Sequence, residues 1–197
     1  MRFNPLIPAE GVSDQFYLSA IEKVLIRERM IAPQKEIVFA PSGGVRGVPG
    51  ITSLVAAKND DLPYVILDSD KGGNDFRHRL EAGTYKDCKG KIISIHEVTS
   101  LDQSEVEDII PYKIIENKVQ YILRVNNDVD EEFEYELGMP ILLQIEQYAE
   151  EHSIELPQGW RVELAPAFNR KAFGKKKVEI PDENIKRWKT LFNKLLT

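Results

Sequence analysis

The stretch from Val65 to Gly73, Val-Ile-Leu-Asp-Ser-Asp-Lys-Gly-Gly, constrains the fold more than any other feature of the chain. Its short, continuous apolar run predicts a strand buried on both faces, as in a parallel α/β sheet. Asp68 and Asp70 follow at the carboxyl end of this strand, where ligands of open α/β sheets bind. Residues two apart along a strand share a face, so both carboxylates can converge on one hard cation. A solvated turn is the competing interpretation of so short a motif.

A second acidic motif lies near the start of the chain. Apolar residues at helical spacing predict a helix over residues 13–29, with Ser13 as its N-cap. Glu10 then ends the first strand, and Asp14 lies in the first helical turn. Because the ends of parallel strands open onto one sheet edge, we expect both residues to join the Asp68–Asp70 pair there. Such an acidic cluster is costly without bound cations. A favourable first-turn charge on the helix dipole is the alternative role for Asp14.

Strands and helices alternate in the first half of the chain. Further strands are predicted at 36–41, 64–68 and 91–96, and further helices at 51–58 and 74–82. This alternation predicts an α/β fold with a parallel sheet and right-handed crossovers. Helices dominate afterwards, with predictions at 104–110, 112–123, 140–152 and from 182 onward. The acidic segment 128–136 predicts an exposed linker. We therefore expect an α/β core at 1–104 and a helical region at 105–197 that completes it.

Three motifs together resemble a Toprim domain, the metal-dependent fold shared by topoisomerases, bacterial primases and several nucleases. They are an E-G-x-x-D turn after the first strand, a Gly-Gly after the second and an L-D-x-D after the third. Within that group, D-S-D-K-G-G and the later element 106–111 resemble the OLD (overcoming lysogenization defect) family endonucleases. The likeness covers about residues 5–115. It implies a Toprim-like parallel sheet flanked by helices, with an additional C-terminal helical lobe. The implied activity is metal-dependent cleavage of DNA, in the setting of phage defence.

The resemblance also assigns roles to individual residues. Two Mg²⁺ or Mn²⁺ ions would be held by Glu10, Asp14, Asp68, Ser69, Asp70, Glu107 and Asp108, with Glu10 and Asp70 also catalytic. Two such ions about 4 Å apart can stabilise both the attacking and the leaving oxygen of a phosphodiester. Ser69 would face the opposite side of the strand unless the backbone turns there. Glu107 and Asp108 also fit acidic residues that favour a helix N-terminus.

The C-terminal segment is basic, whereas the chain as a whole is acidic. Residues 161–197 hold ten basic and four acidic residues, although the net charge of the chain is −6. In the OLD family a lysine beyond the Toprim core supports the transition state, and the resemblance places it at Lys177 first and Lys176 second. Phosphate contacts are expected from Lys71, Arg170, Lys175, Lys176 and Lys177. A solvated basic loop that touches phosphates without catalysis fits the segment equally well.

The resemblance and the composition also bear on partners. OLD proteins couple an N-terminal ABC-type ATPase to the Toprim region, but the chain has no G-x-x-x-x-G-K-[ST] phosphate loop and so no ATP site is expected in it. We expect the C-terminal part of a longer, ATPase-coupled protein that acts on DNA, with a homodimer as a further expectation for the full-length protein. Three scattered histidines and a single cysteine exclude an H-E-x-x-H zinc site and an internal disulfide. No apolar run approaches the roughly 20 residues that span a bilayer, which favours the cytoplasm.

The main alternative is a non-catalytic Toprim-like module for nucleic-acid binding or assembly, in which the carboxylates are only solvated. A haloacid-dehalogenase-type phosphatase fits less well, because its D-x-D normally follows the first strand and here the motif follows the third. A primase or topoisomerase module would need a zinc ribbon or a catalytic tyrosine context, and neither is evident. Binding of Mg²⁺ or Mn²⁺ separates the nuclease from the assembly module.

Overall fold

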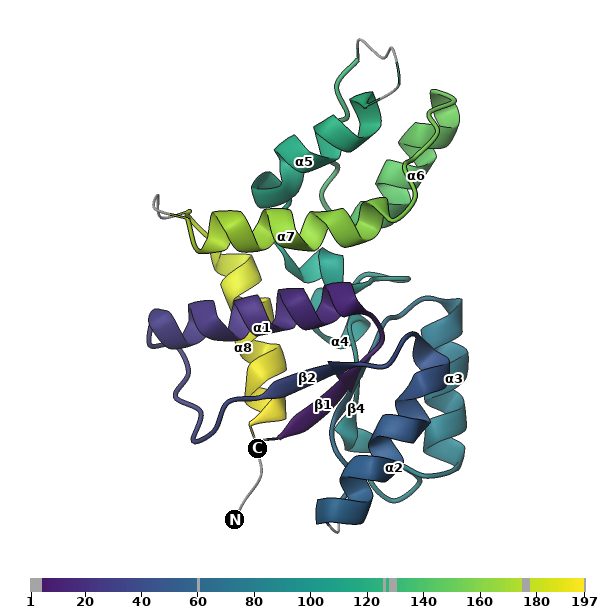
Figure 1. The fold of residues 1–197 in the computed structure, drawn as a ribbon, viewed down its shortest axis with the longest axis vertical. Coiled ribbons are helices and arrows are strands. Elements are labelled where there is room, and N and C mark those ends of the chain that lie inside the picture. The colour runs from purple at the N-terminus through teal and green to yellow at the C-terminus, as the bar shows by residue number, and fades with distance from the viewer. Residues whose placement is uncertain (1–4, 60, 126, 128–130, 175–177, 197) are drawn as a thin grey trace.

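The computed structural model describes residues 5–59, 61–125, 127, 131–174 and 178–196, and it places two pairs of short parallel strands at the centre (Figure 1). β1 (Leu6–Ala9) pairs with β2 (Val38–Pro41), and β3 (Val65–Leu67) pairs with β4 (Ile92–Ser94). β1 also lies beside β3. The prediction of a mixed α/β fold with parallel strands is confirmed. Among the described residues, however, the hydrogen bonds join two separate strand pairs rather than one continuous sheet.

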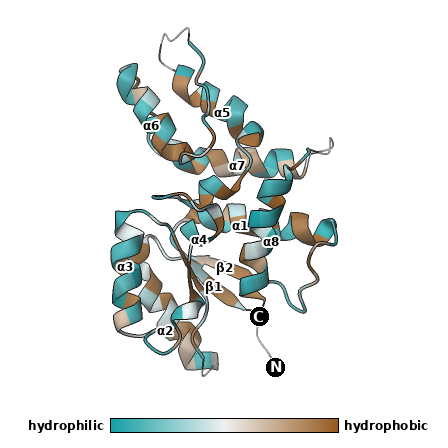
Figure 2. Cartoon of the chain, turned by 180° about the vertical axis from the view of Figure 1, so that it is seen from behind, coloured by the Kyte–Doolittle hydropathy of each residue, from teal (hydrophilic) through white to brown (hydrophobic). Residues whose placement is uncertain are grey.

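Both faces of β3 are buried, as its apolar run predicts. Ile66 belongs to a large core formed with α1 (Val12–Arg27) and α8 (Asp182–Leu195). Val65 and Leu67 point the other way, into a smaller core with α3 (Lys71–Ala82) and the start of α2 (Val48–Asn59). Alternating side chains of a strand face opposite sides, so helices must cover both. Figure 2 shows the hydrophobic colour concentrated on the strands between these helices.

The second half of the chain is helical, but two of its elements differ from prediction. It contains α4 (His96–Thr99), α5 (Tyr112–Arg124), α6 (Ile141–Glu151) and α7 (Trp160–Ala172), with 3-10 turns η1 (Val45–Gly47), η2 (Lys89–Lys91) and η3 (Val106–Ile109). The helix expected from residue 104 is wrong, because only η3 forms before Pro111. α7 was not predicted, since Pro166 within it obscures the pattern. Packing of α7 on α1 and α5 offsets the cost of the internal proline.

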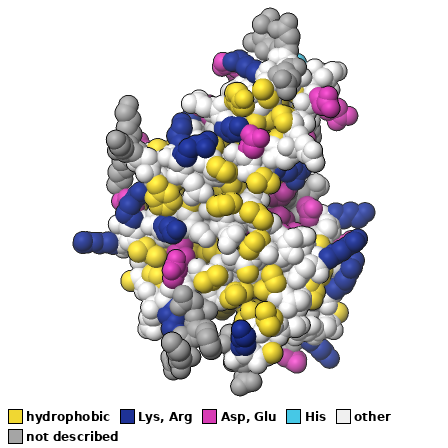
Figure 3. Space-filling model, in the orientation of Figure 1, with side chains coloured by type: hydrophobic (Ala, Val, Ile, Leu, Met, Phe, Trp, Pro, Cys, Tyr) yellow, Lys and Arg dark blue, Asp and Glu magenta, His cyan; other side chains and the backbone are white. Residues whose placement is uncertain are grey.

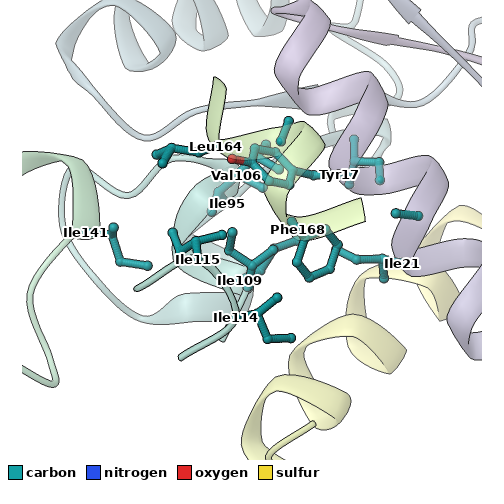
Figure 4. Close-up of a cluster of buried hydrophobic side chains, with 14 of the residues drawn as sticks. Tyr17, Ile21, Ile95, Val106, Ile109, Ile114, Ile115, Ile141, Leu164 and Phe168 are labelled. Atoms are coloured by element: carbon teal, nitrogen blue, oxygen red, sulfur yellow. The ribbon is translucent and has the colours of Figure 1, made fainter. Parts of the chain in front are cut away.

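The core runs without interruption across the expected division at residue 104. Phe168 of α7 lies between Tyr17 of α1 and Trp188 of α8, with ring centroids 5.7 Å and 6.3 Å away. Figure 4 shows this junction, to which α1, η3, α5 and α7 all contribute side chains. Helices α5 and α6 project from the body as a lobe (Figure 1). The expected exposed linker is wrong in part: Phe133 is buried and stacks edge-on against Tyr148 of α6. No described helix is long and apolar enough to cross a membrane.

Candidate metal centre

The turn from β3 into α3 presents Asp68 and Asp70. Asp70 is the N-cap of α3, and its Oδ1 accepts a hydrogen bond of 2.6 Å from the Gly73 amide. A Cβ on Gly73 would lie only 2.2 Å from the carbonyl oxygen of Asp68, so a glycine is needed for this close turn. Asp70 is exposed, whereas Asp68 is partly buried and accepts a 3.2 Å hydrogen bond from the Val106 amide. The D-S-D-K-G-G motif thus fixes both aspartates through backbone contacts.

Glu10 and Asp14 lie at the same edge. Glu10 Oε1 accepts a 3.0 Å hydrogen bond from the Asp68 amide, which joins the end of β1 to the end of β3. Asp14 is buried in the first turn of α1 and accepts from the Gly11 amide at 2.8 Å. The N-cap is Gly11 and not Ser13, because the helix begins at Val12. The four acidic residues that the two motifs supply are therefore brought to one place, as predicted.

Turn η3 adds further carboxylates, and α8 holds it in position. Trp188 Nε1 donates to the carbonyl of Ile109 at 2.7 Å, and Arg187 Nη1 donates to the carbonyl of Asp108 at 3.0 Å. Glu107 is only 3% exposed. Asp108 has a structural role instead: its oxygens accept from the amides of Ile141 at 2.6 Å and Glu105 at 2.8 Å, which ties η3 to the start of α6. We use "carboxylate cluster" for Glu10, Asp14, Asp68, Asp70, Glu105 and Glu107.

Burial, and after it the neighbouring charges, raises the pKa of several of these carboxyl groups. Burial raises the pKa of Glu10 to about 7. The hydrogen bond from Asp68 opposes this rise, and the charges of Asp14 and Asp70 reinforce it. Burial also raises the pKa of Asp68 well above its usual range, and the neighbouring Asp14, Glu10 and Glu107 raise it further. The pKa of Glu107 is raised by burial, then by Asp14 and Glu105. The protonated forms of Glu10, Asp68 and Glu107 are therefore favoured relative to those of free carboxyl groups.

The donor set suits a hard divalent cation, because all its side-chain ligands are oxygens. In the part of the chain that the structure describes, no three acidic, histidine or cysteine side chains converge closely enough to hold one ion as they stand. Several of these carboxylates instead accept hydrogen bonds from backbone amides. Mg²⁺ binds through few carboxylates and keeps several waters. Figure 3 shows acidic side chains in a recess beside the first turns of α1 and α7.

Ser69 takes no part in this group of oxygens. Its side chain is buried on the opposite side of the turn, where the hydroxyl lies 2.8 Å from that of Ser94 and accepts from the His96 amide at 2.7 Å. A second contact joins it to Ser104 at 3.4 Å. The alternation of side chains along the strand anticipates this placement. Ser69 thus braces the turn that carries the two aspartates.

Two of the expected phosphate-binding residues are described, and they lie on different helices. Lys71 is exposed at the start of α3, directly after Asp70. Arg170 lies near the end of α7 and lines a cavity of about 570 Å³ with Lys118 and Lys171. Lys175, Lys176 and Lys177 lie outside the described residues. The nearest described residues before them contact the far end of α1: Arg27 donates to the carbonyl of Ala172 at 3.1 Å.

Arg161 is the described basic residue that contacts the carboxylate cluster. Its guanidinium lies 3.2 Å from Glu105 and also pairs with Glu146 of α6. The charge of Arg161 opposes the effect of burial on Glu105, whose pKa is nevertheless raised to about 7. Sequence reasoning missed Arg161 because α7 was not predicted. Sequence reasoning also missed Glu105, although its i, i+2 spacing with Glu107 is a signal that could find it.

Comparison of the chain with protein-family models, with curated proteins and with solved structures finds no significant match.

Proposed function

We propose that the chain is a Mg²⁺- or Mn²⁺-dependent nuclease that hydrolyses DNA phosphodiester bonds. The observation that carries this proposal is the carboxylate cluster: six acidic side chains gather where β1 and β3 end, and several of them raise one another's pKa. Isolated buried charges are expensive, and a cluster of like charges is retained mainly where cations or chemistry require it. The order and spacing of the Toprim-like motifs, with their OLD-like D-S-D-K-G-G run, support the same conclusion.

The proposed roles follow from exposure and neighbours. Asp70 and Glu10 would be ligands on the open side of the cluster, with Asp14, Asp68 and Glu107 behind them. Bound divalent ions would supply charge neutralisation and an activated water for in-line attack on phosphorus. Glu10, whose pKa is about 7 in the metal-free protein, can exchange a proton at neutral pH. Arg161 is 42% exposed on its side chain and so can turn from Glu105 toward a substrate phosphate.

Incubation with supercoiled plasmid and Mg²⁺ or Mn²⁺, with EDTA as control, tests the activity. Asp70→Asn is the sharpest variant, because asparagine keeps the N-cap of α3 and removes only the charge. We expect cleavage to be abolished while circular dichroism and melting temperature stay unchanged. Asp87→Ala is the matched control, since Asp87 is an exposed aspartate beyond the other end of α3. Equal activity of Asp70→Asn and the wild type would exclude the assignment of Asp70.

Calorimetry with Mn²⁺ separates the nuclease from its main alternative. A wild type that binds Mn²⁺ and DNA but leaves plasmid intact would be a nucleic-acid-binding or assembly module. A wild type that binds no divalent cation would remove the metal centre itself. An N-terminal ATPase region and a homodimer remain proposals that rest on the family resemblance.

A further inference from the structure

The hydroxyl of Tyr17 is buried beneath the carboxylate cluster without a hydrogen-bond partner among the described residues. The side chain is 0% exposed, and its ring lies against Phe168. Burying a hydroxyl without a hydrogen bond is unfavourable, by about 1–3 kcal/mol in protein mutational data. A phenylalanine would provide the same packing without that cost. The oxygen is therefore a feature that the packing of the core does not explain.

The surroundings of this hydroxyl point to Glu107. Tyr17 lies one turn after Asp14 on the same buried face of α1, and α1 contacts η3. Figure 4 shows the Tyr17 ring reaching from α1 toward Val106, the residue that precedes Glu107. Burial raises the pKa of Tyr17 well above its usual range, and the charges of Glu107 and then Asp14 raise it further. Both carboxylates are thus close enough to influence the phenol.

Glu107 is the better acceptor of the two. The oxygens of Asp14 already accept hydrogen bonds from the Gly11 amide and the Ser13 hydroxyl, at 2.8 Å and 3.3 Å. The same helical turn therefore satisfies Asp14. Glu107 lies on η3, which faces Tyr17 across the core, and it is almost completely buried. Its own backbone amide already donates one hydrogen bond to this carboxylate. Because water has little access to it and a carboxylate can accept several hydrogen bonds, a further protein donor is the natural partner of its charged form.

We propose that Tyr17 is a positioning residue of the metal centre, whose hydroxyl donates a hydrogen bond to the Glu107 carboxylate when Glu107 binds a divalent cation. The inference rests on the proposed metal-dependent function. Ligating carboxylates are generally oriented by hydrogen bonds from outer partners, and loss of such a partner costs about 10–100-fold in metal affinity. In the metal-free protein the hydroxyl contributes no such bond, so Tyr17 should favour the loaded form at the expense of the metal-free form.

Two measurements on the full chain test this assignment. Mn²⁺ affinity by calorimetry should be about 10–100-fold weaker in Tyr17→Phe than in the wild type. The melting temperature of the same variant in EDTA should be equal to or higher than that of the wild type. Loss of a merely structural hydroxyl would not weaken Mn²⁺ binding while leaving the melting temperature in EDTA unchanged or higher. Tyr112→Phe is the matched control, because Tyr112 also has a buried hydroxyl without a partner among the described residues and lies on α5, away from the cluster.

Each outcome decides the matter. Mn²⁺ affinity of Tyr17→Phe within about twofold of the wild type, or an equal loss in Tyr112→Phe, overturns the inference and leaves the proposed function intact. A wild type that does not bind Mn²⁺ contradicts the proposed function as well. If Tyr17→Phe does not fold, the near-ultraviolet difference spectrum of the wild type on adding Mg²⁺ provides the second test. A tyrosine perturbation that disappears in Glu107→Gln supports the hydrogen bond, and one that persists there excludes it.

Discussion

At the residue scale, Gly72 and Gly73 differ in the space that the structure leaves for a side chain. A Cβ on Gly73 would meet the Asp68 carbonyl at 2.2 Å, whereas the nearest atom to a Cβ on Gly72 is a terminal oxygen of Asp70 at 3.5 Å. Gly73→Ala should therefore lower the free energy of unfolding by about 1–3 kcal/mol and displace Asp68, a ligand of the proposed metal centre. Gly72→Ala should be neutral or slightly stabilising, because alanine favours the helix. Urea unfolding of both variants measures this; equal stabilities would show that the turn does not need a glycine at 73.

A candidate site residue can be predicted from the sequence only where the neighbouring residues indicate its role. Asp68 and Asp70 could be predicted, because a buried strand, an acidic pair and a glycine turn are adjacent in the chain. The position of Ser69 on the other side of the turn also follows from strand alternation. Asp108 could not be predicted, since its oxygen is bound by the amide of Ile141, 33 residues later in the sequence. The capping contact with the Glu105 amide, three residues earlier, is local, but nothing near Asp108 in the sequence indicates the bond from Ile141.

At the element scale, the sequence of α7 separates two basic candidates for a role in the proposed cleavage step. Arg161 contacts Glu105 at its start, and the lysine segment follows its end. Arg161 and Ala172 are about 16 Å apart along a helix axis that rises roughly 1.5 Å per residue. Arg161→Gln should lower the single-turnover cleavage rate by about 10²–10³-fold, whereas Lys177→Ala should mainly weaken DNA binding at high salt. Glu146→Gln controls for the loss of the ion pair, and the reverse ranking of the two variants would return the catalytic role to Lys177.

The same element shows why local patterns fail in the second half of the chain. Pro166 lies inside α7, and isolated helices with an internal proline are unfavourable, so the sequence pattern does not indicate a helix. Contacts with α1 and α5 provide the stability instead. Turn η3 is the opposite case, because its sequence predicts a helix that does not form. Its acidic residues resemble a helix start, but backbone bonds to Asp68, Asp108 and α8 hold it as a short 3-10 turn.

At the scale of the whole molecule, both faces of the central strands are covered, and this could be predicted from their continuous apolar runs. The separation of four strands into two hydrogen-bonded pairs could not, because the strands are only three or four residues long. Register over so short a length depends on how α1, α3 and α8 pack around them. Part of the negative charge of the chain comes from the carboxylate cluster. The net charge alone therefore does not exclude a DNA partner.

The cluster should make stability depend on pH in an unusual direction. Glu10 and Glu105 have pKa values of about 7 in the folded metal-free protein and about 4.5 when unfolded. Between these values the folded chain binds more protons, so the stabilisation is complete below about 4.5 and is lost as the pH rises through 7. The melting temperature in EDTA should therefore fall between pH 5.5 and 8.5, by roughly 2–4 °C for each kcal/mol lost. Burial acts to raise the pKa of Glu97, but its contacts with Lys194 and other groups lower it below its usual value. Glu97 is therefore already ionised between pH 5.5 and 8.5 and does not contribute to the change in melting temperature.

Added Mn²⁺ should reverse this loss, and more so at pH 8.5 than at pH 5.5, because protons compete with the cation for the same carboxylates. Thermal unfolding with and without Mn²⁺ across this range measures both effects. Glu10→Gln should flatten the slope in EDTA, since glutamine cannot take up or release the proton. Glu151→Gln is the control, because Glu151 is exposed at the end of α6. A melting temperature in EDTA that rises or stays constant toward pH 8.5 would show that burial and neighbouring charges do not raise the pKa values of Glu10 and Glu105 in the folded chain.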